Sequence, residues 1–178
     1  KKSESIFFSR RRKTPPPILV NAQRLKWSNH TTYLGITFHR HLSWSRHINQ
    51  TQNKAQAAFI ALKPFFDNKN VNNRTKLRAF SAIIRSICTY AIPIWGTSEN
   101  GLKRIQGTFM RLLKSSLKIP WYIRNSQILK EIPIISPSQA APQFAANLHK
   151  TVRNHPNPAV SSLIRFCPRA HERVKRPY

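Results

Sequence analysis

Electric charge is the feature that most constrains the fold of this chain, because 31 Lys and Arg residues stand against 5 Asp and Glu residues. A formal net charge of +26 makes a compact monomer repel itself unless a polyanion offsets the charge. The polyanions available are DNA, RNA and anionic membranes, and no stretch approaches the roughly 18 apolar residues that a membrane span needs. The charge therefore favours a nucleic acid as the partner and argues against a membrane.

The 178 residues suffice for one domain with a hydrophobic core, or for one domain with an appendage. Hydrophobic residues make up 40% of the chain, which is more than a disordered chain of this charge normally contains. Two isolated cysteines, Cys88 and Cys167, fit a reducing compartment. We expect an intracellular protein, and the basic cluster Arg10–Lys13 is compatible with a weak nuclear signal.

The first part of the sequence is typical of β structure. Short apolar or alternating runs predict strands at Ser5–Ser9, Ile18–Val20 and Arg24–Trp27. A further strand is predicted over Thr32–Phe38, in which Gly35 marks a bulge or a close approach of the backbone to another group.

Beyond His41 the apolar period becomes helical. The first predicted helix is capped by Ser43 or Ser45, and Pro64 falls near its end. Its core face consists of Ile48, Ala55, Phe59, Leu62 and Phe66.

Further helices are predicted between Asn72 and Pro93 and between Ser98 and Pro120. Weaker patterns indicate helices at 126–131 and 138–153, and the segment from His155 is expected to be disordered. The fold class is therefore α+β and mainly α, with a small N-terminal β region followed by a helical bundle.

Basic residues recur at helical spacings on the second and third predicted helices. They are Arg74, Arg78 and Arg85 on the second helix, and Arg104, Arg111 and Lys118 on the third. Such stripes are ordinarily the solvated faces of amphipathic helices. Because few acidic residues are present to pair with them, we interpret both stripes as surfaces that contact a phosphate backbone.

The tryptophans can either stack on bases or belong to the core. Trp95 lies at the end of an apolar helix and is assigned to the core, whereas Trp44 remains ambiguous. Trp27 and Trp121 are left open between the two roles.

Catalytic chemistry has little support in the sequence. The acidic residues lie singly along the chain, as Glu4, Asp67, Glu99, Glu131 and Glu172. Two-metal phosphoryl transfer needs at least two convergent carboxylates, and no glycine-rich phosphate loop is present either. The zinc candidates His39, His41 and His47, with Cys167 and His171, lack a second closely spaced pair, so no metal site is predicted.

Several ordered segments resemble the downstream end of a non-LTR retrotransposon reverse transcriptase, in particular that of the jockey-like LINE elements of insects. The segments are Lys2–Ser9, Tyr33–Ile36 and Leu42–Ile48, followed by Tyr90–Trp95, Ile105–Gln106 with Arg111–Leu112, and His155–Pro158. The resemblance covers most of the chain.

The resemblance implies a role for particular positions. Lys2 would lie near the phosphates of the incoming nucleotide, and Tyr33, Leu34 and Gly35 would form the primer-grip hairpin that places the primer's 3′ end. The helices after Ser43 would be the thumb, which holds RNA, DNA or an RNA–DNA hybrid. The implied division is 1–42 for the end of the palm, 43–120 for the thumb, and 121–178 for a basic extension.

The chain also departs from the family pattern. The catalytic aspartates, the fingers and most of the palm would lie upstream of Lys2, so we expect this chain to be inactive alone, with Mg²⁺ needed by the complete enzyme. A stand-alone basic RNA-binding protein of ribosomal or packaging type is the alternative, and a decayed copy of the element is a further one. The upstream palm and fingers would be partners of this piece.

Overall fold

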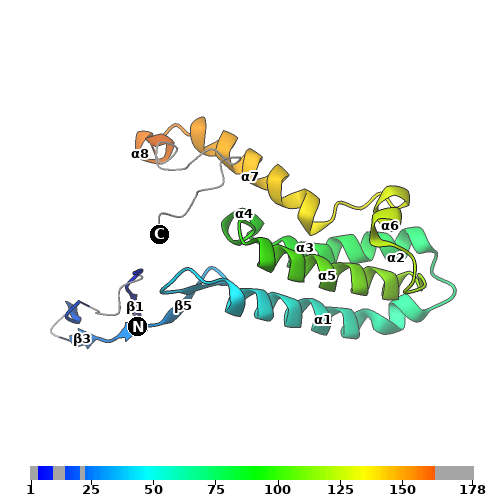
Figure 1. Ribbon diagram of the computed structural model, residues 1–178, viewed down its shortest axis with the longest axis horizontal. Coiled ribbons are helices and arrows are strands. Elements are labelled where there is room, and N and C mark those ends of the chain that lie inside the picture. Colours follow the sequence, from blue (N-terminus) through cyan, green and yellow to red (C-terminus); the bar gives the residue numbers. More distant parts are fainter. Residues whose placement is uncertain (1–3, 10–14, 21–22, 163–178) are drawn as a thin grey trace.

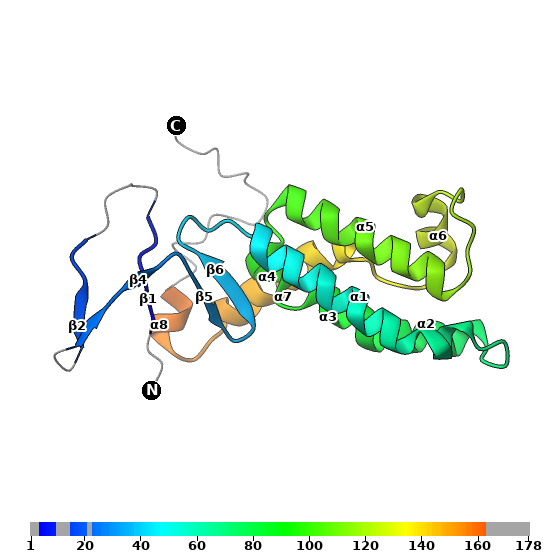
Figure 2. The same cartoon turned by 90° about the horizontal axis from the view of Figure 1, so that it is seen from below.

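The structure is a computed structural model that describes residues 4–9, 15–20 and 23–162 (Figures 1 and 2). The roles predicted for Lys2, the cluster Arg10–Lys13, and Cys167 with His171 fall outside these residues. Short strands occupy one end of the molecule, and most of the helices extend away from them (Figure 1). This confirms the predicted class, α+β and mainly α.

The β region of the described residues consists of three separate two-stranded sheets. Strand β1 (Ser5–Ile6) pairs in parallel with β4 (Trp27–Ser28), β2 (Ile18–Val20) pairs antiparallel with β3 (Gln23–Leu25), and β5 (His30–Tyr33) pairs antiparallel with β6 (Ile36–His39). An isolated two-stranded sheet is marginal in water, so these pieces depend on contacts with the rest of the molecule.

The single strand predicted over Thr32–Phe38 is wrong, because the chain reverses there. Leu34 (φ 47°) and Gly35 (φ 77°) form a two-residue turn that pairs Tyr33 with Ile36. Positive φ at both central positions matches the twist of an antiparallel hairpin, and glycine adopts it without steric cost. Gly35 also lies close to another group, since a Cβ there would stand 3.6 Å from the ring of Tyr90.

Helix α1 (Ser45–Asp67) begins at a position that neither predicted serine cap would give. Its N-cap is Trp44, which makes no side-chain capping bond, and Ser45 is already helical, so the predicted serine cap is wrong. Pro64 lies inside the helix, in its last turn. The face formed by Ile48, Ala55, Phe59 and Phe66 is buried as predicted.

The next helix contains a π turn. Helix α2 (Asn73–Phe80) is capped by Asn72, whose Oδ1 accepts a hydrogen bond from the backbone N of Thr75 at 2.8 Å, and it continues as η1 (Ser81–Arg85) and α3 (Ser86–Thr89). Its buried positions are four apart: Lys76, Phe80, Ile84 and Cys88. A regular α-helix has 3.6 residues per turn, so this spacing drifts off one face, and the wider π turn corrects the drift.

The predicted end of this helix at Pro93 is wrong. The helix ends at Thr89, Ala91 adopts a left-handed conformation (φ 52°), and Pro93 lies in the first turn of α4 (Ile92–Trp95). Trp95 is fully buried, and its Nε1 donates to the carbonyl of Tyr90 at 2.7 Å. The assignment of Trp95 to the core is therefore confirmed.

Further helices follow α4 along the chain. Helix α5 (Glu99–Ser116) is capped by Ser98, whose Oγ accepts from the backbone N of Gly101 at 3.3 Å. Helices α6 (Asn125–Glu131), α7 (Pro137–Arg153) and α8 (Pro158–Ser161) follow. Helices α5, α6 and α7 lie where the sequence predicts them, whereas the short α8 lies in the segment from His155 that was expected to be disordered. No helix in the described part of the chain combines the length and the apolar character that crossing a membrane requires.

The core lies between α1, the α2–α3 helix and α5, and α7 packs against α4 and α5 (Figures 1 and 2). A series of ring contacts joins the three: Phe66 of α1 lies 6.5 Å from Phe80 of α2, which lies 5.3 Å from Phe109 of α5. One continuous apolar core thus fixes the relative positions of α1 and α5, the two helices that carry the basic groups described next.

Candidate nucleic-acid interface

Arginines of α5 are held against polar side chains of α1. Arg104 Nη2 donates to Asn49 Oδ1 at 2.5 Å and to Gln52 Oε1 at 2.9 Å. Two helical turns further along, Arg111 Nη2 donates to Gln56 Oε1 at 3.2 Å. The amide oxygens orient both guanidinium groups without neutralising them, so the positive charge remains available to an anion.

Lys118 continues this row beyond the end of α5. Its Nζ lies 3.8 Å from Asp67 Oδ1 and donates to the carbonyl oxygen of Asp67, the last residue of α1. Arg104, Arg111 and Lys118 therefore all contact α1, in order along the two helices, and we call this row the α1–α5 seam. The structure brings together the whole basic stripe predicted for the third helix.

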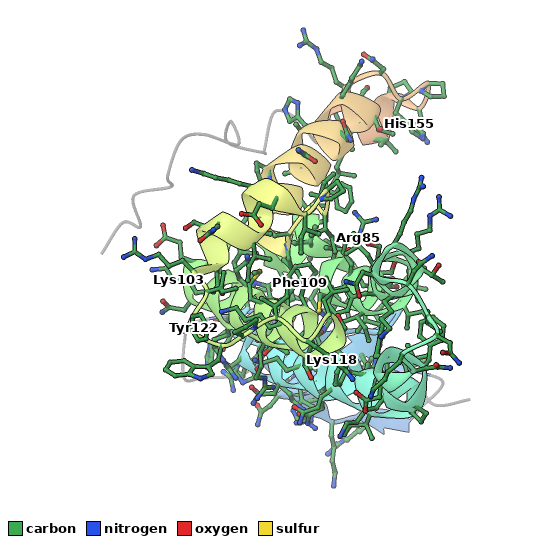
Figure 3. The ribbon with its side chains drawn as sticks, turned by 90° about the vertical axis from the view of Figure 1, so that its right-hand side faces the viewer. Arg85, Lys103, Phe109, Lys118, Tyr122 and His155 are labelled. Atoms are coloured by element: carbon green, nitrogen blue, oxygen red, sulfur yellow. The ribbon has the colours of Figure 1, made fainter. Side chains whose placement is uncertain are left out.

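The stripe predicted for the second helix is interrupted. Arg74 and Arg78 are exposed, but Arg85 is half-buried, with a buried Nε that makes no hydrogen bond to the described residues. The turn Ser81–Arg85 contains more residues than a regular α turn. Arg85 is therefore rotated away from Arg74 and Arg78. In the view of Figure 3, Arg85 and Lys118 lie on opposite sides of the buried Phe109.

The hairpin β5–β6 presents its tip to solvent. The side chains of Tyr33 and Leu34 are 66% and 70% exposed. Tyr90, at the end of the α2–α3 helix, donates its Oη to the carbonyl of Leu34 at 2.7 Å. The three residues predicted as a primer grip, Tyr33, Leu34 and Gly35, thus form a tethered turn, and their role stays a prediction.

His47 attaches the same hairpin to α1. Its Nδ1 accepts from the backbone N of Thr37 at 3.4 Å, and Gln50 Oε1 accepts from Thr37 Oγ1 at 2.6 Å. Burial, and to a smaller extent the charge of Lys54, lowers the pKa of His47 below 6.5. A neutral ring with Nδ1 as acceptor therefore joins the β region to the helices.

The other tryptophans separate by exposure. Trp27 and Trp44 are half-buried, with Trp27 Nε1 donating to the carbonyl of Pro15 at 2.8 Å and the ring of Trp44 lying 5.7 Å from that of Phe38. Trp121, in contrast, is 87% exposed.

Sequence reasoning missed the amides that orient the arginines. Asn49, Gln52 and Gln56 repeat at spacings of three and four on α1, which is the signal of one helical face. Nothing in the sequence, however, indicates that this face lies beside α5 and not beside solvent. Tyr90 belongs to a segment that carries the family resemblance, but its hydrogen bond to Leu34 depends on how the chain folds.

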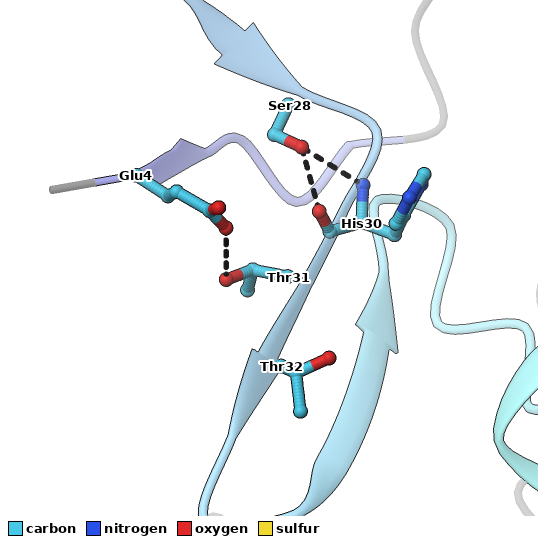
Figure 4. Close-up of a pocket in the computed structure, with 5 residues that line it drawn as sticks. All are labelled: Glu4, Ser28, His30, Thr31 and Thr32. Carbon is cyan, nitrogen blue, oxygen red and sulfur yellow. Dashed lines mark hydrogen bonds between the residues drawn. The ribbon is translucent and has the colours of Figure 1, made fainter. Parts of the chain in front are cut away.

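A polar hollow of about 450 Å³ lies at the β end of the molecule (Figure 4). It is lined by Glu4, Ser28, His30, Thr31 and Thr32. Thr31 Oγ1 donates to Glu4 Oε2 at 2.9 Å, and Ser28 Oγ donates to the carbonyl of His30 at 2.6 Å. Arg46 Nη1 lies 2.7 Å from His30 Nε2. One carboxylate lines the hollow, whereas two-metal chemistry needs a convergent pair.

Of the three histidines in the described residues that were considered as zinc ligands, two lie close to each other. The rings of His39 and His41 are 5.3 Å apart, whereas His47 is buried against the hairpin. Within the described residues, no three His, Cys, Asp or Glu side chains gather as a group that would hold a metal ion.

The fold and the α1–α5 seam together define a mainly helical basic protein with oriented arginines on its surface. No protein-family model and no solved structure matches the chain. Several curated proteins, however, match the chain in sequence. The chain is 22% identical over 169 residues to the probable RNA-directed DNA polymerase from transposon X-element of Drosophila melanogaster, an alignment that covers 94% of this chain and 19% of the relative.

Two further relatives carry related names. The chain is 22% identical over 158 residues to the RNA-directed DNA polymerase from mobile element jockey of Drosophila funebris, and 21% identical over 141 residues to the probable RNA-directed DNA polymerase from transposon BS of Drosophila melanogaster. These alignments cover 88% and 78% of this chain, but only 17% and 16% of the relatives. The predicted resemblance to jockey-like non-LTR retrotransposon reverse transcriptases is confirmed, and the chain spans less than a fifth of the relatives' length.

Proposed function

We propose that this chain is the part of a non-LTR retrotransposon reverse transcriptase that holds the primer–template duplex by its phosphates. The observation that carries the proposal is the α1–α5 seam, in which Arg104 and Arg111 are oriented by amides of α1. The resemblance to RNA-directed DNA polymerases supports RNA, DNA or their hybrid as the ligand.

The dimensions of the seam suit a phosphate backbone. Residues seven positions apart on an α-helix are about 10 Å apart, at 1.5 Å per residue. Arg104 and Arg111 have this separation and Lys118 follows at the end of the helix, so the seam spans several phosphates of a strand. Phosphate contacts carry no sequence information, and we expect little sequence preference.

The proposal also gives a role to the hairpin and assigns catalysis to residues outside this chain. Tyr33, Leu34 and Gly35 would place the primer end, because the bond from Tyr90 fixes the turn relative to the helices. Catalysis and Mg²⁺ binding would belong to aspartates of the parent polymerase outside this chain, and Lys2 would contact the nucleotide phosphates. The chain alone would be inactive, with the upstream palm and fingers as its partners.

The proposal is tested by binding of the full 178-residue chain to a labelled RNA–DNA hybrid over a salt series, with single strands and duplex DNA for comparison. If about five phosphates are contacted, log K should fall against log salt with a slope of roughly −4 to −5. Tight binding of the hybrid with this slope supports the proposal. A slope near zero contradicts it, and a preference for single-stranded RNA would favour the stand-alone RNA-binding alternative.

A pair of double variants locates the contact. Arg104→Gln with Arg111→Gln should reduce the magnitude of the salt slope by about 2, because each lost phosphate contact removes about one counterion. Lys150→Gln with Arg153→Gln removes the same charge from α7 and is the matched control. Equal losses in the two double variants would show that net charge, and not the seam, determines binding. Arg74→Gln with Arg78→Gln tests the second predicted stripe in the same way.

A further inference from the structure

Two aromatic side chains project from a short turn that follows α5. The backbone N of Ile123 donates to the carbonyl of Pro120 at 3.3 Å, which places Trp121 and Tyr122 at the centre of the turn. Trp121 is 87% exposed and Tyr122 is 70% exposed. Their ring centroids are 6.1 Å apart in an edge-to-face arrangement. We call residues 120–123 the aromatic turn, and Figure 3 shows Tyr122 on the side of the bundle away from Arg85.

The aromatic turn is held firmly although its side chains are free. Lys114 Nζ, from the last turn of α5, donates to the carbonyl of Trp121 at 3.0 Å and to that of Ile123 at 2.7 Å. Ile119 and Ile123, on either side of the two rings, pack against the core. The backbone of the turn is therefore fixed, and the two rings are presented to solvent at an ordered position.

Such exposure indicates a ligand. Large aromatic side chains bury 150–250 Å² when covered, and leaving two of them in water forgoes that gain. The bonds from Lys114 to the carbonyls of Trp121 and Ile123 fix the backbone of the turn while both rings stay in solvent. An exposed aromatic pair on a fixed backbone is an arrangement suited to stacking.

The surroundings of the aromatic turn are basic. Lys118, the last residue of the α1–α5 seam, precedes Trp121 by three positions, and the exposed Arg124 follows it by three. Arg124 therefore places beside the rings a positive charge that suits a nucleic acid, whereas the charge of Lys118 is shared with Asp67. Bases inside a duplex already stack on one another, so only unpaired nucleotides offer free faces to aromatic side chains.

We propose that Trp121 and Tyr122 stack on unpaired nucleotides that extend beyond the duplex held by the α1–α5 seam. The proposal rests on the function proposed above and adds a second contact, specific for single-stranded nucleic acid. The duplex ends where Lys118 ends the seam, and the emerging strand meets the aromatic turn. Arg124 contacts a phosphate of that strand.

The test compares two labelled RNA–DNA hybrids of the same duplex sequence, one blunt and one with a single-stranded extension. The full chain should bind the extended hybrid more tightly. Trp121→Ala with Tyr122→Ala should lower this advantage by at least about fivefold and leave blunt binding unchanged, because stacking contributes about 1–3 kcal/mol per base. Trp121→Phe with Tyr122→Phe should restore most of the advantage, and Leu148→Ala, an exposed apolar residue of α7, is the control.

The outcomes separate this proposal from the preceding one. Blunt-hybrid binding with a steep salt slope but no advantage from the extension overturns the stacking proposal alone. Equal weakening of both hybrids by the double alanine variant also overturns it, and would assign the aromatic turn to duplex contact. If blunt binding is absent while the chain binds single strands through Trp121 and Tyr122, the proposed function is overturned, and so is the position of the stacked nucleotides beyond a bound duplex. Circular dichroism confirms that each variant folds.

Discussion

The helical region and the β region of this molecule differ in how they are stabilised. Helices α1, α2 to α4 and α5 share one core, in which Phe66, Phe80, Ile84, Trp95 and Phe109 are almost fully buried. The β region contains three two-stranded sheets, and its strand β2 leaves Ile18, Leu19 and Val20 44–65% exposed. The helical region can therefore stabilise itself, whereas the β region depends on what it contacts.

Polar contacts join the two regions, beside the contact between the rings of Phe38 and Trp44. Thr37 of the hairpin bonds to His47 and Gln50 of α1, and Leu34 accepts from Tyr90. Polar contacts of this kind contribute far less than a buried apolar core. The helices therefore position the hairpin, so the helical region determines where the proposed primer contact lies.

The largest effect expected is the difference between a core residue and a β-region residue. Phe109→Ala should reduce the free energy of unfolding by about 3–5 kcal/mol, since it removes a fully buried ring from the centre of the core. Leu19→Ala should change it by less than about 0.5 kcal/mol, because Leu19 is 65% exposed. Chemical denaturation followed by circular dichroism measures both. Similar losses of unfolding free energy in the two variants would show that the two regions do not differ in how they are stabilised.

A smaller effect is expected at the tether between the regions. Tyr90→Phe removes the bond to the carbonyl of Leu34, and should cost about 0.5–1.5 kcal/mol where the hairpin and helices unfold together. Hydrogen exchange should accelerate for the amides of β5 and β6 but not for those of α5. Tyr33→Phe, at the exposed tip of the hairpin, is the matched control. Unchanged exchange in β5 and β6 would show that the tether does not hold the hairpin.

The last prediction concerns pH and the second joint, His47. Because burial lowers its pKa in the folded chain, the ring is neutral in both states above pH 6.5, and its contribution to stability is complete there. As the pH falls below 6.5 the unfolded chain binds a proton that the folded chain resists, so the free energy of unfolding decreases. Denaturation at a series of pH values should show a flatter profile for His47→Gln. His155→Gln, in an exposed segment, should keep the original profile.

Local signals in the sequence predicted much of the helical region. Asn72 and Ser98 are the side chains that cap α2 and α5, and the apolar spacing of Phe59 and Phe66 placed the core face of α1. The local pattern missed the chain reversal between β5 and β6, which only the family resemblance implied, and it missed the π turn, both for physical reasons. A leucine with positive φ at position 34 is unfavourable by itself, and the π turn exists because packing fixes a spacing of four at Lys76–Cys88.

The candidate site was predicted in part. Arg104 and Arg111 were visible from spacing alone, because α5 is a regular helix. Lys118, in contrast, lies beyond its end with a positive φ and joins the row through Asp67. The partners of Arg104 and Arg111 on α1 were not visible, since a contact across more than fifty positions depends on how the helices pack. Arg85 is the last residue of the π turn, so a spacing that assumes a regular helix does not give its position relative to the other two arginines of its stripe.

Because 31 residues are basic and 5 are acidic, dissolved salt has opposite effects on the folding of this protein and on its proposed binding of nucleic acid. Counterions screen the repulsion among cations that have no carboxylate to pair with, and so favour the folded chain. The same ions compete with Arg104 and Arg111 for phosphates, and so release the nucleic acid. Dilute buffer would thus favour the complex, and concentrated salt would favour the free protein. For a chain of this composition, the nucleic acid and dissolved salt are interchangeable sources of the same stabilising charge.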